Sequence, residues 1–259
     1  MNIPIALAQL DLKSADLEGN YLKVFDKVKE AAEMGAEIVL LPELWSSGFD
    51  LEQTQKYASP IGEGWFKKMG DLAVENHIAV GGSLIEDNKG HYFNTFVLYK
   101  NNGDLLGSYR KIHLFQMLQE DIHFEGGKNI TVIDSSWGKI GLTICYDLRF
   151  PEIFRSCAVQ GAELILLVAE WPRRRIEHWK VLLQARAIEN QCYIAAVNKV
   201  GTSQGAILGG NSAIINPMGE FLVLGGEGED LLLAEINLDE VSRIRNWMPV
   251  FEDRRPDIY

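Results

Sequence analysis

Short runs of consecutive apolar residues are the feature that most restricts how this chain can fold. Strands that alternate between polar and apolar residues have one face in water, whereas strands that are apolar almost throughout are buried on both faces. Runs of the second kind recur along the whole chain. We predict buried strands at Ile3–Leu10, Ile38–Leu41, Ile78–Leu84, Ile140–Ile144, Leu164–Val168, Tyr193–Val197 and Leu231–Ile236.

Segments with helical spacing of apolar residues are fewer than these strands. Helices are predicted from Leu17 to a stop at Gly35, and over Trp65–Ala73, Phe150–Gln160, Ile176–Asn190 and Val241–Arg245. So few helices would not cover both faces of one large sheet. Two sheets packed face to face, with helices outside each, would bury every apolar strand. We therefore expect an α/β fold with four layers, an α-β-β-α sandwich, in a single domain of residues 1–259.

The sequence also predicts two hairpins and the location of the last residues of the chain. Asn101–Asp104 and Asn216–Gly219 each separate two short strands, so we predict hairpins there. The last residues, 247–259, carry Pro, Arg and aromatic side chains without periodicity. We expect this tail to pack on another surface, that of a partner subunit.

Composition and charge exclude several classes of function. The chain has a formal net charge of −11 and no tract rich in Lys or Arg, which argues against a nucleic-acid-binding protein. No apolar stretch is long enough to span a membrane, and the first residues lack the basic segment of a secretory signal. The three cysteines include no Cys-x-x-Cys pair, which favours reduced thiols in a cytoplasmic protein.

Motifs for metals and nucleotides do not occur. The five histidines form no His-x-His or His-x-x-x-His pair, so a zinc site is not expected. Neither the Gly-x-Gly-x-x-Gly pattern nor a phosphate-binding Gly-x-x-x-x-Gly-Lys loop occurs. We predict neither a metal nor a cofactor.

Reactive residue types follow three of the predicted strands. Glu43 and Cys145 come just after buried strands, and Lys111 follows the first hairpin. Catalytic groups in α/β proteins gather beyond the carboxyl ends of strands, although each residue also has an ordinary explanation as a solvated charge or a core thiol. Cys145 stands out because it occupies a strand-to-helix turn. Backbone N–H groups and a helix dipole there would lower the pKa of the thiol and stabilise an oxyanion.

These three positions resemble the motifs of the nitrilase superfamily of carbon–nitrogen hydrolases. The matching segments are Leu41–Glu43, Tyr109–Leu114 and Ile144–Glu152, in the order and with the spacing of that family. The resemblance extends from Ile5 to the closing Arg254–Tyr259. It implies the same α-β-β-α sandwich that the strand pattern predicts, in a protein that pairs into homodimers.

The resemblance also implies a catalytic triad of Glu43, Lys111 and Cys145. Glu43 would be the general base that takes the thiol proton and later activates water. Cys145 would attack an amide carbonyl and form a thioester, while Lys111 and the backbone N–H of Tyr146 would stabilise the oxyanion. Glu120 matches a second glutamate of the family, which would position Lys111 and the substrate.

Two further segments, Ala169–Arg175 and Ala185–Gln191, are similar to the ω-amidase branch of the family. This similarity implies that the substrates are 2-oxo acid amides, such as 2-oxoglutaramate and 2-oxosuccinamate, and that the terminal carboxamide is hydrolysed. A 2-oxo acid group requires a cation at the far end of the pocket, which an arginine could supply through two parallel hydrogen bonds.

Three side chains are expected around such a substrate. One arginine of the loop, Arg173, Arg174 or Arg175, would bind the carboxylate, and Arg173 is the first candidate. Trp171 would line the pocket. Arg149 is expected to support the site through a bond to a carboxylate such as Glu152.

Other functions stay open at this point. An N-carbamoyl amino acid hydrolase or another small-amide amidase would use the same triad on a different carbonyl. A protein of another class, a non-catalytic interaction protein that acts by oligomerising, would keep the fold without the activity.

Overall fold

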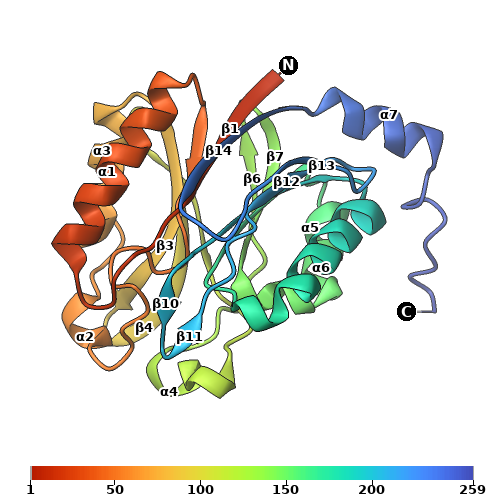
Figure 1. The fold of residues 1–259 in the computed structure, drawn as a ribbon. Coiled ribbons are helices and arrows are strands. Elements are labelled where there is room, and N and C mark those ends of the chain that lie inside the picture. Colours follow the sequence, from red (N-terminus) through yellow and green to blue (C-terminus); the bar gives the residue numbers. More distant parts are fainter. Residues whose placement is uncertain (1, 259) are drawn as a thin grey trace.

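Two six-stranded sheets packed face to face form the centre of the molecule in the computed structural model, which describes residues 2–258 (Figure 1). The outer face of the first sheet is covered by α1 (Leu17–Glu33) and α3 (Gly64–Glu75). The outer face of the second is covered by α5 (Pro151–Val159) and α6 (Ile176–Asn190). The predicted α-β-β-α sandwich is therefore confirmed.

The first sheet joins the two ends of the chain. Its order is β14-β1-β2-β3-β4-β5, with β1, β2 and β3 parallel to one another. The last strand, β14, pairs antiparallel with β1 along its whole length, from Asn2 opposite Asn237 to Gln9 opposite Asp230. The strands are β1 (Asn2–Gln9), β2 (Ile38–Leu40), β3 (Ala79–Asn88), β4 (His91–Tyr99), β5 (Leu105–Arg110) and β14 (Asp230–Asn237).

The second sheet has the same arrangement, with three parallel strands, and is formed by the middle of the chain. Its order is β13-β12-β9-β8-β7-β6, and β7, β8 and β9 are parallel. The strands are β6 (Val132–Ser135), β7 (Gly138–Ile144), β8 (Leu164–Ala169), β9 (Tyr193–Asn198), β12 (Ala213–Ile215) and β13 (Phe221–Leu224). Because the central strands are parallel in both sheets, residues just beyond their carboxyl ends collect at one end of each sheet.

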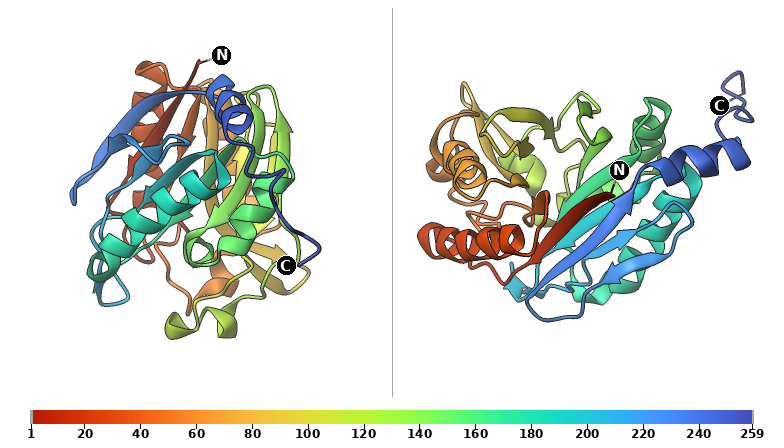
Figure 2. Two further views of the ribbon diagram at one scale, coloured as in Figure 1. Left: turned by 90° about the vertical axis from the view of Figure 1, so that its right-hand side faces the viewer. Right: turned by 90° about the horizontal axis from the view of Figure 1, so that it is seen from above.

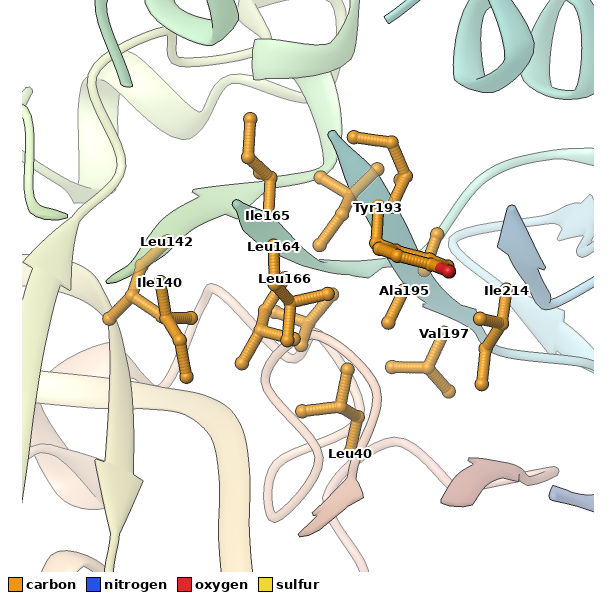
Figure 3. Close-up of a cluster of buried hydrophobic side chains, with 14 of the residues drawn as sticks. Leu40, Ile140, Leu142, Leu164, Ile165, Leu166, Tyr193, Ala195, Val197 and Ile214 are labelled. Atoms are coloured by element: carbon orange, nitrogen blue, oxygen red, sulfur yellow. The ribbon is translucent and has the colours of Figure 1, made fainter. Parts of the chain in front are cut away.

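The main hydrophobic core lies between the two sheets. Leu40 of β2 points toward side chains of the second sheet, including Leu166 and Val197 (Figure 3), and all three are fully buried. Each fully buried leucine contributes roughly 1.5–3 kcal/mol relative to an exposed one. The apolar strands were predictable for this reason: a strand between a second sheet and a layer of helices has no face on which a polar side chain meets water.

Local signals set the ends of the helices as expected. The side chain of Asp16 caps α1 by accepting a hydrogen bond from the N–H of Gly19 at 3.2 Å. The helix stops before Gly35, whose positive φ of 85° suits glycine. The last helix, α7 (Asp239–Trp247), is longer than predicted.

Several short elements were not predicted. They include α2 (Thr54–Tyr57), the 3-10 turn η1 (Gln116–Leu118), α4 (Glu120–His123), η2 (Cys145–Arg149), η3 (Arg173–Arg175), β10 (Thr202–Ser203) and β11 (Ala206–Ile207). A segment of two to five residues has too few positions to display a period, so no pattern reveals it. In Figure 1, α4 and the β10–β11 hairpin lie at the same end of the molecule.

The chain end departs from the two-sheet body after α7, as the view from above shows (Figure 2). The ring of Phe251 lies under the guanidinium groups of Arg155 and Arg245, 5.3 and 5.0 Å from its centre. Trp247 is 68% exposed. Within residues 2–258, no helix combines the length and the apolar character needed to cross a membrane.

Candidate active site

Glu43, Lys111 and Cys145 meet at one end of the sandwich, although they come from different strands of the two sheets. Glu43 and Lys111 follow β2 and β5 of the first sheet, and Cys145 follows β7 of the second. Lys111 Nζ lies 2.8 Å from Glu43 Oε1 and 2.7 Å from an oxygen of Glu120. The side chains of Glu43, Lys111 and Glu120 are buried, with at most 1% of their surface exposed.

Both oxygens of Glu43 are held by hydrogen bonds. Oε1 accepts from Lys111 and, at 2.8 Å, from the amide of Asn94, while Oε2 accepts from the backbone N–H of Glu170 at 3.0 Å. Asn94 and Glu170 were not predicted. Asn94 lies within the buried part of β4, and a polar side chain at such a position is the signal that sequence analysis could have used.

Opposite charges keep Lys111 protonated. Burial alone would lower the pKa of Lys111, but Glu120 and Glu43 raise it well above its usual value. Burial raises the pKa of Glu120 to about 7, although Lys111 pulls it down. Glu120 also accepts a hydrogen bond from the N–H of Phe115 at 2.6 Å, so it joins Lys111 to the loop beside the site. Glu120 thus lies beside Lys111, and its role in positioning Lys111 and the substrate stays a prediction.

Cys145 occupies a strained turn. Its φ is 44°, a left-handed value that is unusual for a residue other than glycine, and it is the first residue of η2 after β7. Asp147 holds this turn, because its carboxylate accepts hydrogen bonds from the N–H of Ile144 at 2.9 Å and from the hydroxyl of Tyr109 at 2.8 Å. The predicted strand-to-helix turn is confirmed.

The expected lowering of the pKa of Cys145 is wrong. Burial and the neighbouring carboxylates, Glu43 first among them, raise the pKa of the thiol well above its usual value, and Lys111 offsets only part of this. The helix that begins at Cys145 is a 3-10 segment of five residues, too short to oppose a buried carboxylate. The thiol is therefore protonated at rest and needs a base to become a nucleophile.

A cavity opens beside these groups. Lys111, Glu120 and Cys145 line one part of it, and the aromatic rings of Phe49 and Phe115 form an apolar wall. Tyr146 and Trp171 also line it. The ring of Tyr146 packs against Phe115 and Phe150, and the Trp171 indole donates a hydrogen bond to the carbonyl of Arg175 at 2.8 Å. In the described part of the chain, no group of three His, Cys, Asp or Glu side chains could hold a metal ion.

Two expectations about arginines are corrected. Arg173 lies outside the cavity: it is exposed, and its guanidinium is 3.4 Å from Glu227 because η3 turns this side chain away. Arg149 is not bonded to Glu152. Its guanidinium lies over the ring of Trp171, 4.8 Å from the centre, and 3.3 Å from Nδ1 of His178.

The cavity is instead lined by Arg149, Arg174 and Arg175. Within residues 2–258, none of the three forms an ion pair with a carboxylate. Burial and the positive charges of Arg174 and Arg149 lower the pKa of Arg175. Three positive charges that converge without a counter-charge favour an anionic group between them.

Comparison with known proteins shows which proteins this chain is similar to. The family model described as carbon–nitrogen hydrolase matches residues 4–246. The chain is 36% identical to the 2-oxoglutaramate amidase of Bacillus subtilis, covering 100% of both chains. It is 32% identical to the human omega-amidase NIT2, covering 98% of this chain and 96% of that one.

Solved structures show the same fold. The protein XC1258 from Xanthomonas campestris, described as a CN-hydrolase superfamily protein with an arsenic adduct in its active site, has a TM-score of 0.92. It is 30% identical and covers 98% of both chains. Saccharomyces cerevisiae Nit3, a member of the nitrilase superfamily, has a TM-score of 0.90 at 28% identity, covering 98% of this chain and 97% of that one.

Replacing Glu120 should change how stability depends on pH. The pKa of this carboxyl is about 7 in the folded protein and 4.5 ordinarily, so the folded state retains the proton longer than the unfolded state. The contribution of this carboxyl to the free energy of unfolding is complete below pH 4.5. It is lost as the pH rises to about 7, which lowers the free energy of unfolding by about 3 kcal/mol. Glu120→Gln lacks this ionisation, so its stability should rise relative to the wild type over the same range.

Urea unfolding of both proteins at about pH 5 and pH 8 measures this effect. From about pH 5 to pH 8, the free energy of unfolding of the variant should rise by about 3 kcal/mol relative to that of the wild type. A difference that stays constant across this range would contradict the raised pKa of Glu120.

Proposed function

Because the chain belongs to the carbon–nitrogen hydrolase family and is an amide-hydrolysing enzyme, we propose that it acts on 2-oxo acid amides such as 2-oxoglutaramate and 2-oxosuccinamate. Water replaces the terminal amide nitrogen, and the products are the 2-oxo dicarboxylate and ammonia. The relatives named 2-oxoglutaramate amidase and omega-amidase support this substrate class.

In the first half of the reaction, Glu43 activates the thiol and Lys111 then stabilises the charge that develops on the substrate. Glu43 takes the proton of the Cys145 thiol, and the sulfur attacks the amide carbon. The carbonyl oxygen becomes an oxyanion, which Lys111 Nζ and the N–H of Tyr146 stabilise. The C–N bond then breaks, Glu43 returns the proton to the leaving nitrogen, and ammonia departs from a thioester on Cys145.

The second half restores the enzyme. Glu43 removes a proton from water, the resulting hydroxide attacks the thioester carbon, and the same oxyanion contacts form again. The C–S bond breaks, the sulfur takes the proton from Glu43, and the acid product leaves. The raised pKa of the thiol supports a role for Glu43 in both halves, because without a base the sulfur stays protonated.

The observation that carries the substrate proposal is the group of three unpaired arginines in the same cavity as Cys145. An amide with a 2-oxo acid group at its other end places a carboxylate and a keto oxygen among Arg149, Arg174 and Arg175. The positive charges that lower the pKa of Arg175 would then meet a counter-charge. A neutral amide offers them nothing comparable.

Ammonia release tests the proposal directly. We expect the protein to release ammonia from 2-oxoglutaramate but not from glutamine, and Cys145→Ala to lose this activity because the nucleophile is gone. N-carbamoyl-β-alanine serves as the competing substrate. Its turnover in place of the keto amide would assign the triad to an N-carbamoyl amino acid hydrolase, and silence on all three compounds would overturn the proposal.

The arginines allow a matched comparison. Arg149→Gln and Arg175→Gln should each raise KM for 2-oxoglutaramate by roughly 10–100-fold with a smaller change in kcat, because each removes a charged hydrogen bond to the bound carboxylate. Arg173→Gln is the control, since it changes the same charge in the same loop outside the cavity. Equal KM values for all three variants would show that these arginines do not bind the substrate.

We also propose that the protein is a homodimer and that residues 247–259 pack on the partner subunit. Val181 and Ile188 lie seven residues apart on α6 and are 61% and 53% exposed, and Trp247 is 68% exposed. A second copy would bury these apolar side chains.

Light scattering should return about twice the chain mass of 29.1 kDa. Removal of the residues after Asn246 should shift this value toward that of a single chain. A single-chain mass for the intact protein would contradict the dimer, and an unchanged dimer after truncation would contradict the role of the tail.

A further inference from the structure

A second buried ion pair lies beside the triad. Lys199 Nζ is 2.6 Å from Glu170 Oε1, and the two side chains are 0% and 5% exposed. Ala169 and Asn198 are partners in the parallel pairing of β8 and β9, so Glu170 and Lys199 each follow the last paired residue of their strands. Glu170 lines the cavity, whereas Lys199 is enclosed behind it.

The main chain of Glu170 contacts both the base and the nucleophile. Its N–H donates to Glu43 Oε2 at 3.0 Å, and its carbonyl oxygen lies 4.0 Å from Cys145 Sγ. The backbone on the other side is also held, because the N–H of Lys199 donates to the carbonyl of Ala169 at 3.1 Å. A shift of the main chain at residue 170 would therefore move a hydrogen bond of Glu43 and the surroundings of the sulfur together.

Stability alone does not account for this pair. Removing two charges from water costs several kcal/mol per ion, and an apolar pair of similar size is often as stable or more stable. Leucine, valine and alanine fill the adjoining parts of β8 and β9, so apolar side chains would suit both positions. An ion pair here thus requires another reason.

We propose that Glu170 is a positioning residue, which Lys199 anchors from behind and which sets the orientation and the electrostatic surroundings of Glu43 and Cys145 through its main chain and its charge. The proposal rests on the proposed function only for the roles of Glu43 and Cys145. It does not depend on which amide is the substrate.

The titratable groups that face Glu43 determine in which direction its ionisation should change. They are Lys111 from the end of β5, Glu120 from α4, the Cys145 thiol from η2 and Glu170 from the end of β8. In the intact pair the charges of Glu170 and Lys199 cancel. Loss of the Glu170 charge alone would leave an ammonium group near Glu43, which favours the ionised form of the catalytic carboxylates.

Two variants separate charge from anchoring. Glu170→Gln removes the charge but can still accept a hydrogen bond from Lys199, so the acid limb of kcat/KM should move down by about one pH unit with kcat reduced by less than about tenfold. The double variant Glu170→Gln, Lys199→Met removes the charge and the anchor. Its acid limb should return to the wild-type position while kcat falls by about 100-fold, because the base is misplaced.

The rate of Cys145 alkylation by iodoacetamide, measured over the same pH range, is the second readout. It needs no substrate, so it tests the positioning even if 2-oxoglutaramate is not turned over. Tyr193→Phe is the control: it removes a partly buried hydrogen bond to Glu240 at the opposite end of β9, and it should leave both pH profiles unchanged. Unfolding of the double variant is not expected, because both charges leave together.

Three results would overturn the proposal. One is that the acid limb of Glu170→Gln lies at the same pH as that of the wild type in both readouts. Another is a double variant with a kcat within about threefold of that of Glu170→Gln. The last is a shift of the profiles by Tyr193→Phe, which would show that any loss of packing in β9 has the same effect.

Discussion

The burial of Lys111 between two carboxylates is the interaction on which the rest of the site depends. An ammonium group without water is costly unless opposite charges and hydrogen bonds surround it, and Glu43 and Glu120 supply both at 2.8 and 2.7 Å. Each carboxylate is fixed in turn, Glu43 by Asn94 and the N–H of Glu170, and Glu120 by the N–H of Phe115. The charges therefore hold their geometry before any substrate enters, as an oxyanion site requires.

The two-sheet fold makes this cluster possible. Parallel strands of both sheets end at the same side, so Glu43 and Lys111 from one sheet reach Cys145 from the other without leaving the protein interior. The same interior raises the pKa of the thiol and keeps the sulfur protonated, which is why the proposed mechanism gives Glu43 the role of base. Burial thus favours the neutral thiol, whereas Lys111 stays charged because Glu120 and Glu43 offset the same loss of water.

Features that depend on burial and on order along the chain were predictable from the sequence. Apolar strands such as Leu164–Val168 indicate two packed sheets, and Glu43, Lys111 and Cys145 stand at strand ends where reactive groups gather. Features that depend on the direction of a side chain were not predictable. Arg173 and Arg174 are neighbours of the same type, but only Arg174 lines the cavity, because a single turn of η3 points them differently. The pKa of Cys145 was predicted wrongly for a related reason. The sequence indicates that a helix begins near Cys145, but it does not show how deeply the thiol is buried or which carboxylates surround it.

The cavity places opposite electrostatic requirements on the two ends of a substrate. Around Cys145, the three carboxylates of Glu43, Glu120 and Glu170 outnumber the two lysines bonded to them, so this end disfavours a further anion and suits a neutral amide. At the other end, Arg149, Arg174 and Arg175 form no ion pair with a carboxylate of the described residues, so that end favours an anion. A molecule with a neutral amide at one end and an acid at the other satisfies both, whereas reversing it would bury a carboxylate against Glu43 and Glu120. For the proposed substrate, charge pairing within the protein therefore favours the orientation in which the amide meets the sulfur.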